Sequence, residues 1–299
     1  MLQVARLAPK ILGEATELLT EFLRSQQNKD GGFRNRSQES DLYYTVFGLE
    51  SLLAVNQPPR IDPSPFIASA GKNAHLDLVH LSSLARCQAN LQTAPPGEWQ
   101  MSFIPPSTDQ KKDLTRRLES FRTSNGGYHA LRGQKNGTAY GAFLALGAYQ
   151  DLEQDLPSPN LLVQSLKDLE TPDGAWANET VMSVGSTNAT AAAVTLLRNL
   201  RQPIQQTAGE WILQRFHQQG GFRATPQAPI PDLLSTATAV HALAGLQYPL
   251  EKYTESCLDY IDTLWTNEGS FHGHWQEDFL DTEYTYYGLL ALGHLSLFT

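Results

Sequence analysis

The chain has 299 residues, of which 41% are hydrophobic and 18% charged, a composition typical of a folded globular protein with a large core. The formal net charge of −9 argues against a general binder of nucleic acid or of anionic membranes, because such a protein needs a basic face. Cys87 and Cys257 are the only cysteines and form no CxxC motif, so we expect a reducing, cytoplasmic environment. We expect neither a signal peptide nor a membrane span, since no apolar run approaches the length of about 18 residues that a span needs.

A short phrase built on glycine recurs along the chain. It joins a polar residue, a glycine, a small residue and an aromatic residue: Asp30-Gly31-Gly32-Phe33, Asn125-Gly126-Gly127-Tyr128, Asp173-Gly174-Ala175-Trp176, Gln219-Gly220-Gly221-Phe222 and Glu268-Gly269-Ser270-Phe271. The aromatic positions are separated by 95, 48, 46 and 49 residues, so the first step is close to twice the others. A fixed period in this range is typical of a repeat protein.

The spacing of apolar residues predicts two helices in each repeat, one before the phrase and one after a polar loop. In chain order the predicted pairs are 15–24 with 42–55, 114–122 with 139–149, 161–169 with 189–200, 211–216 with 233–246, and 253–265 with 284–297. The range 76–91 predicts a helix of a sixth pair that lacks the phrase, and Trp99 could be a diverged remnant of the phrase in that pair. We expect the glycines to end the first helices in a left-handed conformation. The chain is then all-α, with six hairpins of about 47 residues in one closed or stacked domain, 1–299.

The starts of the second helices carry a common pattern. They align on Asp41, Lys135, Ser186, Asp232 and Asp281. The residues four and seven places further on are Thr, Gly or Ala in every helix, and they share one helix stripe with the start. Such a stripe predicts either a close approach of another segment or a thin wall. Asp and Ser are preferred N-cap residues, so we expect four of the five starts to cap their helices.

These features resemble the prenyltransferase/terpene-cyclase superfamily over essentially the whole chain. The phrase is similar to the repeat of protein prenyltransferase β subunits and of squalene cyclases. Two segments carry the most specific likeness, Gly220-Gly221-Phe222-Arg223 followed by Asp232, and Asp281-Thr282-Glu283-Tyr284-Thr285. Both resemble segments that supply zinc ligands in the β subunits. The resemblance implies a closed (α/α)6 toroid whose second helices form an inner ring, with ligands entering a funnel at their N-terminal ends.

The departures from the family pattern concern zinc and diphosphate. The family places a zinc-binding cysteine two residues after the aspartate that Asp232 matches, and here that residue is Leu234. The zinc-binding histidine falls on Tyr284, and the histidine that grips a prenyl diphosphate falls on Ser186. One carboxylate cannot hold zinc, which takes about four ligands, mostly sulfur or nitrogen. We therefore expect no zinc and no other cofactor.

Asp41, Asp232 and Asp281 are the candidate catalytic acids, because the cyclases that the chain resembles start their reaction with a carboxylic acid. The three can be helix caps alone, each stabilising its helix by about 1 kcal/mol. They can also share a pocket if the second helices converge on one mouth. We prefer Asp281, and add Glu283 to the catalytic set, since a like charge two residues away could raise the pKa of Asp281.

Aromatic residues collect in the first turns of the second helices. The candidates for contacting a substrate are Tyr43, Tyr44, Phe47, Tyr140, Tyr284 and Tyr287, together with Trp176 of the phrase. They can be core residues, but a buried tyrosine needs a partner for its hydroxyl, and aromatic faces stabilise a carbocation.

Polar residues in and before the second helices complete the candidates. Arg223 and His272 precede second helices, where they could bind an anion or pair with acidic loop residues. Glu50 and His241 lie nine residues past their starts, about 180° from the cap stripe, and we expect a buried polar pair or wall positions there rather than catalytic residues.

The sequence favours an isoprenoid-handling enzyme, either a cyclase that acts by acid or a transferase without the usual zinc. A non-enzymatic lipid carrier or protein scaffold is the first alternative, because the zinc and diphosphate ligands are missing. A glycan-processing α/α barrel is the second, with Asp41 and Asp281 as acids separated by about 5 to 9 Å. The resemblance also allows a partner like the α subunit of the prenyltransferases, or a homodimer.

Overall fold

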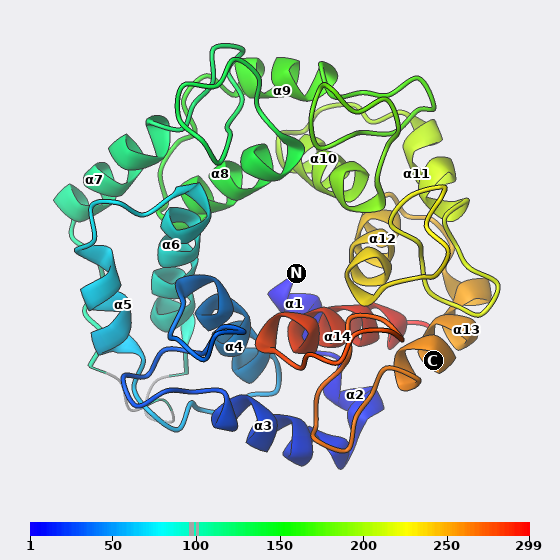
Figure 1. Ribbon diagram of the computed structural model, residues 1–299, viewed down its shortest axis with the longest axis horizontal. Helices are drawn as coiled ribbons and strands as arrows, with labels where there is room; N and C mark the ends of the chain where they lie inside the picture. The colour runs from blue at the N-terminus through cyan, green and yellow to red at the C-terminus, as the bar shows by residue number, and fades with distance from the viewer. Residues whose placement is uncertain (96–98, 100–101) are drawn as a thin grey trace.

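The computed structural model describes residues 1–95, 99 and 102–299, and within these residues it contains fourteen helices arranged as a ring of two layers (Figure 1). The inner layer consists of α4 (Leu42–Ala54), α6 (Leu78–Thr93), α8 (Ala139–Asp151), α10 (Thr187–Asn199), α12 (Leu233–Gly245) and α14 (Thr282–Leu295). The outer layer consists of α3 (Ala15–Ser25), α5 (Ser64–Gly71), α7 (Thr108–Glu119), α9 (Pro159–Lys167), α11 (Gln206–Leu213) and α13 (Glu251–Asp262). Each inner helix packs against the next, and α14 packs against α4, so the ring closes. The predicted all-α toroid of six hairpins is confirmed.

The predicted helices are present, and the differences lie at three places. Helix α5 was not predicted, because it has only eight residues and follows a proline-rich stretch. The start of α8 was placed wrongly at Lys135, since its N-cap is Thr138. Trp99 is wrong as the marker of the sixth repeat, because it follows α6 in the chain, whereas the phrase precedes an inner helix in every other repeat.

The phrase forms a tight turn between the two layers, and its glycine does not end the outer helix as predicted. The outer helix α3 ends in a right-handed residue, Gln26, and Gly31 follows five residues later with φ of 88°. A Cβ on Gly31 would lie 2.2 Å from the carbonyl oxygen of Asp62, just before the next outer helix. Gly220 has φ of 86° and the same close approach, 1.9 Å from the carbonyl oxygen of Ser256. Glycine is required there by both its dihedral angle and its contact.

The stripe of small residues on the inner helices receives this turn. The backbone N–H of Phe222 donates to Oγ1 of Thr236 at 2.9 Å, and the ring of Phe271 lies against Gly288, where a Cβ would be 2.5 Å from it. Both aromatic rings are fully buried. Of the two interpretations of the stripe, close approach is the correct one.

Every inner helix begins with a side-chain N-cap. The caps are Asp41, Asp77, Thr138, Ser186, Asp232 and Asp281, each accepting a backbone N–H of its first turn. The predicted caps of four helices are thus confirmed, and the N-terminal ends of all inner helices share one face of the ring, which we call the mouth. The phrase provides this common direction, because it reverses the chain in the same way in each repeat that has it.

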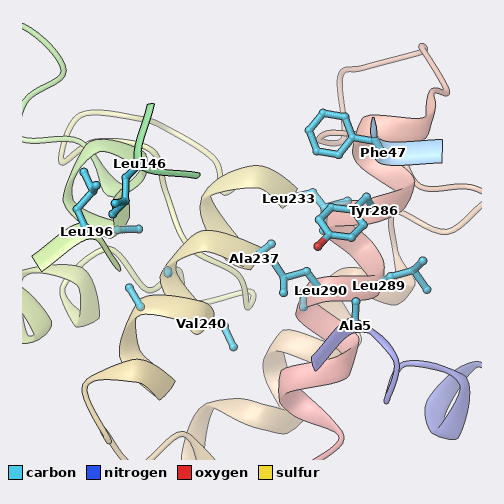
Figure 2. Close-up of a cluster of buried hydrophobic side chains, with 14 of the residues drawn as sticks. Ala5, Phe47, Leu146, Leu196, Leu233, Ala237, Val240, Tyr286, Leu289 and Leu290 are labelled. Carbon is cyan, nitrogen blue, oxygen red and sulfur yellow. The ribbon is translucent and has the colours of Figure 1, made fainter. Parts of the chain in front are cut away.

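The opposite end of the ring is covered by α1 (Leu2–Ala5), whereas α2 (Pro9–Leu12) lies at the outside of the ring beside α3. Figure 1 shows α1 near the centre of the ring, and it packs against α14 and α4. The contact is close, because a Cβ on Gly293 of α14 would lie 2.1 Å from the carbonyl oxygen of Val4. Ala5 belongs to the same buried cluster as Leu289 and Leu290 (Figure 2).

None of the described helices is long and apolar enough to cross a membrane.

Candidate functional site

The inner helices turn a second stripe of residues toward the axis of the ring. A helix rotates about 100° per residue, so the residues 2, 6, 9 and 13 places after the N-cap lie opposite the stripe that receives the turns. We call the space that they surround the lumen. Residues at these places include Tyr43, Phe47 and Glu50 on α4, Arg86 on α6, Tyr140, Gly147 and Asp151 on α8, His241 on α12, and Glu283, Tyr287 and His294 on α14.

The accessibility of these residues shows that the lumen is not filled. Arg86 keeps 39% of its side-chain surface accessible although protein surrounds its guanidinium on nearly every side. Tyr140 is 41% exposed and is similarly enclosed. A Cβ on Gly147 would meet only Nη2 of Arg86, at 3.5 Å. Accessible surface at enclosed positions belongs to the wall of an internal space.

The mouth end of the lumen has an aromatic wall made by α4 and α14. The ring of Phe47 lies 4.9 Å from that of Tyr43, 5.7 Å from Tyr286 and 5.6 Å from Tyr287, between centroids. Figure 2 shows Phe47 and Tyr286 beside each other in the buried cluster. Tyr140 of α8 stands next to Tyr43, and burial raises its pKa to about 12. The structure thus brings together four of the predicted aromatic residues, Tyr43, Phe47, Tyr140 and Tyr287, with Tyr286, and these residues come from α4, α8 and α14.

Glu283 lies in this wall, and its surroundings favour the protonated acid. Its Oε1 accepts a hydrogen bond of 2.6 Å from the hydroxyl of Tyr43, 240 residues away in the chain. Burial raises the pKa of Glu283 to about 7, with a contribution from the negative charge of Asp281, while the Tyr43 hydrogen bond and Arg36 act in the opposite direction. Part of the population is therefore a neutral carboxylic acid at neutral pH.

Asp281 has different hydrogen-bond and ion-pair partners from those of Glu283. It is 4% exposed, one oxygen accepts the N–H of Tyr284, and the other pairs with Arg36 at 3.2 Å. Burial raises its pKa, against the effects of the Tyr284 N–H and of Arg36. The guanidinium of Arg36 also lies over the ring of Tyr284, 5.6 Å from its centroid, and reaches Glu277 at 3.8 Å. Both carboxylate oxygens of Asp281 are thus engaged in holding the mouth of the ring.

Asp41 and Asp232 are also caps with separate partners. The free oxygen of Asp41 lies 3.2 Å from Nε2 of His80, whose Nδ1 lies 2.8 Å from Asp77. Hydrogen bonding to Asp41 raises the pKa of His80 to about 9, and burial of Asp41 is outweighed by this contact and its two backbone N–H bonds, so its pKa is lowered. Asp232 caps α12 by accepting the backbone N–H of Ser235, and burial raises the pKa of Asp232. Among the described residues no hydrogen bond or ion pair joins the three aspartates.

The remaining predicted residues lie around this centre. Tyr44 is half-buried at the mouth, and burial together with the charges of Asp281 and Glu283 raises its pKa to about 12. Trp176 is 4% exposed and donates its indole N–H to Leu166, so it lies between the layers and away from the lumen.

The two predicted anion ligands are in loops on the mouth face. Arg223 precedes α12, and its Nε is buried without a hydrogen-bond partner among the described residues, close to Arg215. His272 occupies the same place in the next repeat, and its Nδ1 is also buried without such a partner. The structure places neither in contact with the aromatic wall.

A second set of lumen residues lies deeper, and sequence reasoning identified only Glu50 and His241 of it. Arg86 pairs with Asp151 at 2.8 Å and approaches Glu50 at 3.5 Å. Nδ1 of His241 lies 2.9 Å from Nε2 of His294, and burial lowers the pKa of these two histidines to about 3 and about 4. Glu50 and His241 do face away from the cap stripe as expected, but they line the lumen. The signal that could have found their partners is the place 9 or 13 residues after each cap.

No group of three His, Cys, Asp or Glu side chains is arranged to hold a metal ion in the part of the chain that the structure describes.

The fold and its caps define a toroid of the prenyltransferase type, and comparison of sequences agrees. The profile of the prenyltransferase alpha-alpha toroid domain matches residues 9–92 and 189–297, and the chain belongs to this family. No curated protein sequence gives a significant match.

Solved structures share the fold at low identity. The apo type II terpene cyclase MstE from Scytonema has 13% identity and a TM-score of 0.63, over 99% of this chain and 98% of that chain. A protein from Actinoplanes has 15% identity and a TM-score of 0.58, over 94% and 98%. A possible member of the GH105 family from Salmonella enterica has 10% identity and a TM-score of 0.55, over 95% and 92%.

Proposed function

We propose that the protein binds an apolar isoprenoid chain in the lumen and that Glu283 starts its reaction by protonating a carbon–carbon double bond. The observation that carries the proposal is the Glu283 carboxyl group in the aromatic wall, with its pKa raised to about 7 by burial and its Oε1 bonded to Tyr43. An acid of this kind is neutral at working pH and can give up its proton without a metal or cofactor. The family's toroid provides the enclosed space in which this chemistry is protected from water.

The proposed step balances as follows. The proton of Glu283 and the π electrons of the alkene form a new C–H bond, and the substrate becomes a carbocation. The Tyr43 hydroxyl then donates to the glutamate carboxylate and stabilises it. The rings of Phe47 and Tyr287 present electron-rich faces, which stabilise a cation by about 0.5–2 kcal/mol each. The cation then loses a proton to solvent, either directly or after adding a water molecule, and Glu283 takes up a proton from solvent, so that the product is an isomer or a hydrate.

We propose Glu283 rather than Asp281 as the acid, because the two carboxyl groups have different partners. Asp281 is bonded to a backbone N–H and to Arg36, which makes it a cap and a support for the mouth. Glu283 has only the Tyr43 bond and faces the lumen. In this proposal Asp281 contributes the negative charge that helps to keep Glu283 protonated.

The rim of the mouth also suits an apolar substrate. The loops that precede inner helices expose large apolar side chains, including Leu131 at 63%, Val181 at 86% and Phe279 at 54%. Such side chains can receive a hydrocarbon chain before it enters the ring. MstE, which shares the fold, has been crystallised with geranylgeranyl dihydroxybenzoate as substrate, an isoprenoid of the proposed class.

A carrier without activity is the second candidate, favoured by Leu234 and Tyr284 at two zinc-ligand positions of the family pattern. To separate the two, the protein is incubated with farnesol, geranylgeraniol, squalene and geranylgeranyl dihydroxybenzoate, and products of equal mass or of added water are sought by mass spectrometry. If the protein is an enzyme, at least one of these compounds should give such a product. Binding of these compounds without any product would support the carrier.

The first prediction concerns Glu283→Gln, which keeps the shape and the contact with Tyr43 but removes the transferable proton. We expect turnover to fall by at least about 100-fold, the usual contribution of a general acid, while substrate binding changes little. Glu179→Gln, in an exposed loop, is the matched control and should keep full activity. Turnover by Glu283→Gln at the rate of the unaltered protein would rule out this acid.

The second prediction is that zinc takes no part in the reaction, which we propose because only Asp232 remains of the family's three protein ligands. Treatment with a strong chelator should leave turnover unchanged and should not release stoichiometric zinc on metal analysis. Loss of activity that zinc restores would contradict this part of the proposal. A partner subunit or a homodimer stays a prediction, which light scattering of the purified chain tests.

A further inference from the structure

The deep end of the lumen is polar, which is unexpected for a space that receives only hydrocarbon. Arg86 stands there between two carboxylates, bonded to Asp151 through Nε at 2.8 Å and to Glu50 through Nη1 at 3.5 Å. Glu50 is 5% exposed, and 11% of the Asp151 side chain is accessible, whereas 39% of the Arg86 side chain is. Donor and acceptor groups therefore reach a space that the protein encloses.

The space beside Arg86 is open because Gly147 occupies the facing position of α8. A side-chain carbon on Gly147 would meet only Nη2 of Arg86, at 3.5 Å, and no other atom within 4 Å. Nη2 makes no hydrogen bond or ion pair among the described residues. Close by, the buried hydroxyl of Tyr286 lies next to Glu50. The Nη2 donor of Arg86 and free space therefore occur at the same level of the ring.

The charges at this level decide which ligand group fits. The two carboxylates, Glu50 and Asp151, balance two positive groups, Arg86 and the N-terminal ammonium of Met1 beside it, so a diphosphate would find no net positive charge to offset its burial. Burial, with the charge of Glu50, raises the pKa of Asp151 to about 6, against the effect of Arg86. A hydroxyl group can accept from Nη2 and donate to a carboxylate at once, which neither an ether nor a hydrocarbon can do.

The position of this level relative to Glu283 sets the length of the ligand. Glu283 lies two places after its cap and Arg86 nine places after its own, a difference of seven residues. At a rise of about 1.5 Å per residue, the two levels are about 10 Å apart along the axis. A short isoprenoid chain can span this distance with one end at each level.

We propose that Arg86, Glu50 and Asp151 form a subsite for the hydroxyl group of the ligand, so that the ligand is an isoprenoid alcohol bound with its hydroxyl end deep and its reacting alkene at Glu283. The isoprenoid nature of the ligand rests on the proposed function. The presence of the subsite does not, because it follows from the open, hydrogen-bonding surface beside Arg86.

The test compares the binding of farnesol, farnesyl methyl ether and farnesyl diphosphate to the purified full chain by fluorescence quenching or calorimetry. We expect farnesol to bind about ten-fold more tightly than the ether, because the ether leaves a buried group unpaired. Farnesyl diphosphate should bind more weakly than farnesol. Equal binding of alcohol and ether, or a preference for the diphosphate, would overturn the subsite.

Variants locate the effect within the lumen. Gly147→Leu fills the space beside Arg86 and should remove the preference for farnesol over its ether. Ala192→Leu adds similar bulk at a partly exposed, axis-facing position of α10, six places after its cap. It should weaken the binding of farnesol and of its ether by the same factor. Arg86→Lys keeps the charge but has fewer donors, and serves as the second variant if Gly147→Leu does not fold. A preference that survives in whichever of these two variants folds would refute the location.

The two proposals fail in different ways. If no isoprenoid compound binds, both the proposed function and the proposed class of ligand are wrong. If farnesol is preferred but Glu283→Gln turns over normally, the acid is wrong and the subsite stands. If turnover depends on Glu283 while the alcohol and the ether bind equally, the subsite is wrong and the acid stands.

Discussion

Glu283 and Asp281 are two residues apart and have different environments, which shows how single residues acquire roles in this protein. Asp281, at the cap, accepts a backbone N–H and the Arg36 guanidinium. Glu283 faces the lumen, where burial raises its pKa to about 7 and only Tyr43 supports its charge. Periodicity explains the difference, because a cap and the residue two places after it point about 200° apart around a helix.

The third prediction is a pH profile set by Glu283. The reaction needs the protonated acid, so turnover should be highest below pH 7 and fall as the pH rises through about 7. Tyr43→Phe removes a hydrogen bond that favours the charged form, so the pKa should rise and the falling limb should move to higher pH. Rates measured from pH 5 to 9 test both statements. A limb that stays in place in Tyr43→Phe would show that another group controls the profile.

At the scale of elements, each inner helix has one stripe for the turn and one for the lumen. The turn stripe is tightly packed, since the N–H of Phe222 bonds to Thr236 and the ring of Phe271 touches Gly288. The lumen stripe is loosely packed at Gly147. Gly288 and Gly147, two glycines of the same inner layer, therefore lack a side chain for opposite reasons, and the sequence pattern alone does not distinguish them.

The fourth prediction uses these two glycines as a matched pair. Gly288→Ala should destabilise the fold by about 1–3 kcal/mol, because its Cβ would lie 2.5 Å from the ring of Phe271. Gly147→Ala should stabilise it by up to about 1 kcal/mol, because the methyl group has space and alanine favours a helix. Urea unfolding of both variants provides the comparison. Equal effects of the two changes would contradict the assignment of the stripes.

At the scale of the whole molecule, ring closure creates the site. The bond between Tyr43 and Glu283 joins residues 240 positions apart, and it exists because α14 packs on α4. At the far end, α1 lies across the ring and packs on Gly293. The lumen therefore has its aromatic wall at the mouth and α1 at the other end.

The fifth prediction tests this cover. Gly293→Val should displace α1, since its Cβ would lie 2.1 Å from the carbonyl oxygen of Val4. Hydrogen exchange should then become faster in residues 2–12, and exchange in α3 should change little. Unchanged protection of residues 2–12 would show that α1 is held by other contacts.

Much of the fold could be predicted from the sequence, because its signals are local. The phrase repeats with a nearly constant period, its glycines hold dihedral angles that other residues rarely adopt, and Asp41, Asp232 and Asp281 cap the helices that follow them. The aromatic candidates on α4 and α14 were also found, since they lie in the first turns of these helices. Two errors fell where a local signal was weak, at the short α5 and at the start of α8, and two others concerned the Trp99 marker and the glycine of the phrase, which does not end the outer helix.

The sequence by itself determined the repeats, the caps and the stripe of small residues on each inner helix, because each of these depends on neighbours within one hairpin. Only the tertiary structure decided which polar residues meet in the lumen. Arg86 comes from a repeat that lacks the phrase, and its partners Glu50 and Asp151 come from the helices on either side. Such contacts follow from the curvature and closure of the ring, which is a sum of packing over all six hairpins and is not encoded in any one of them.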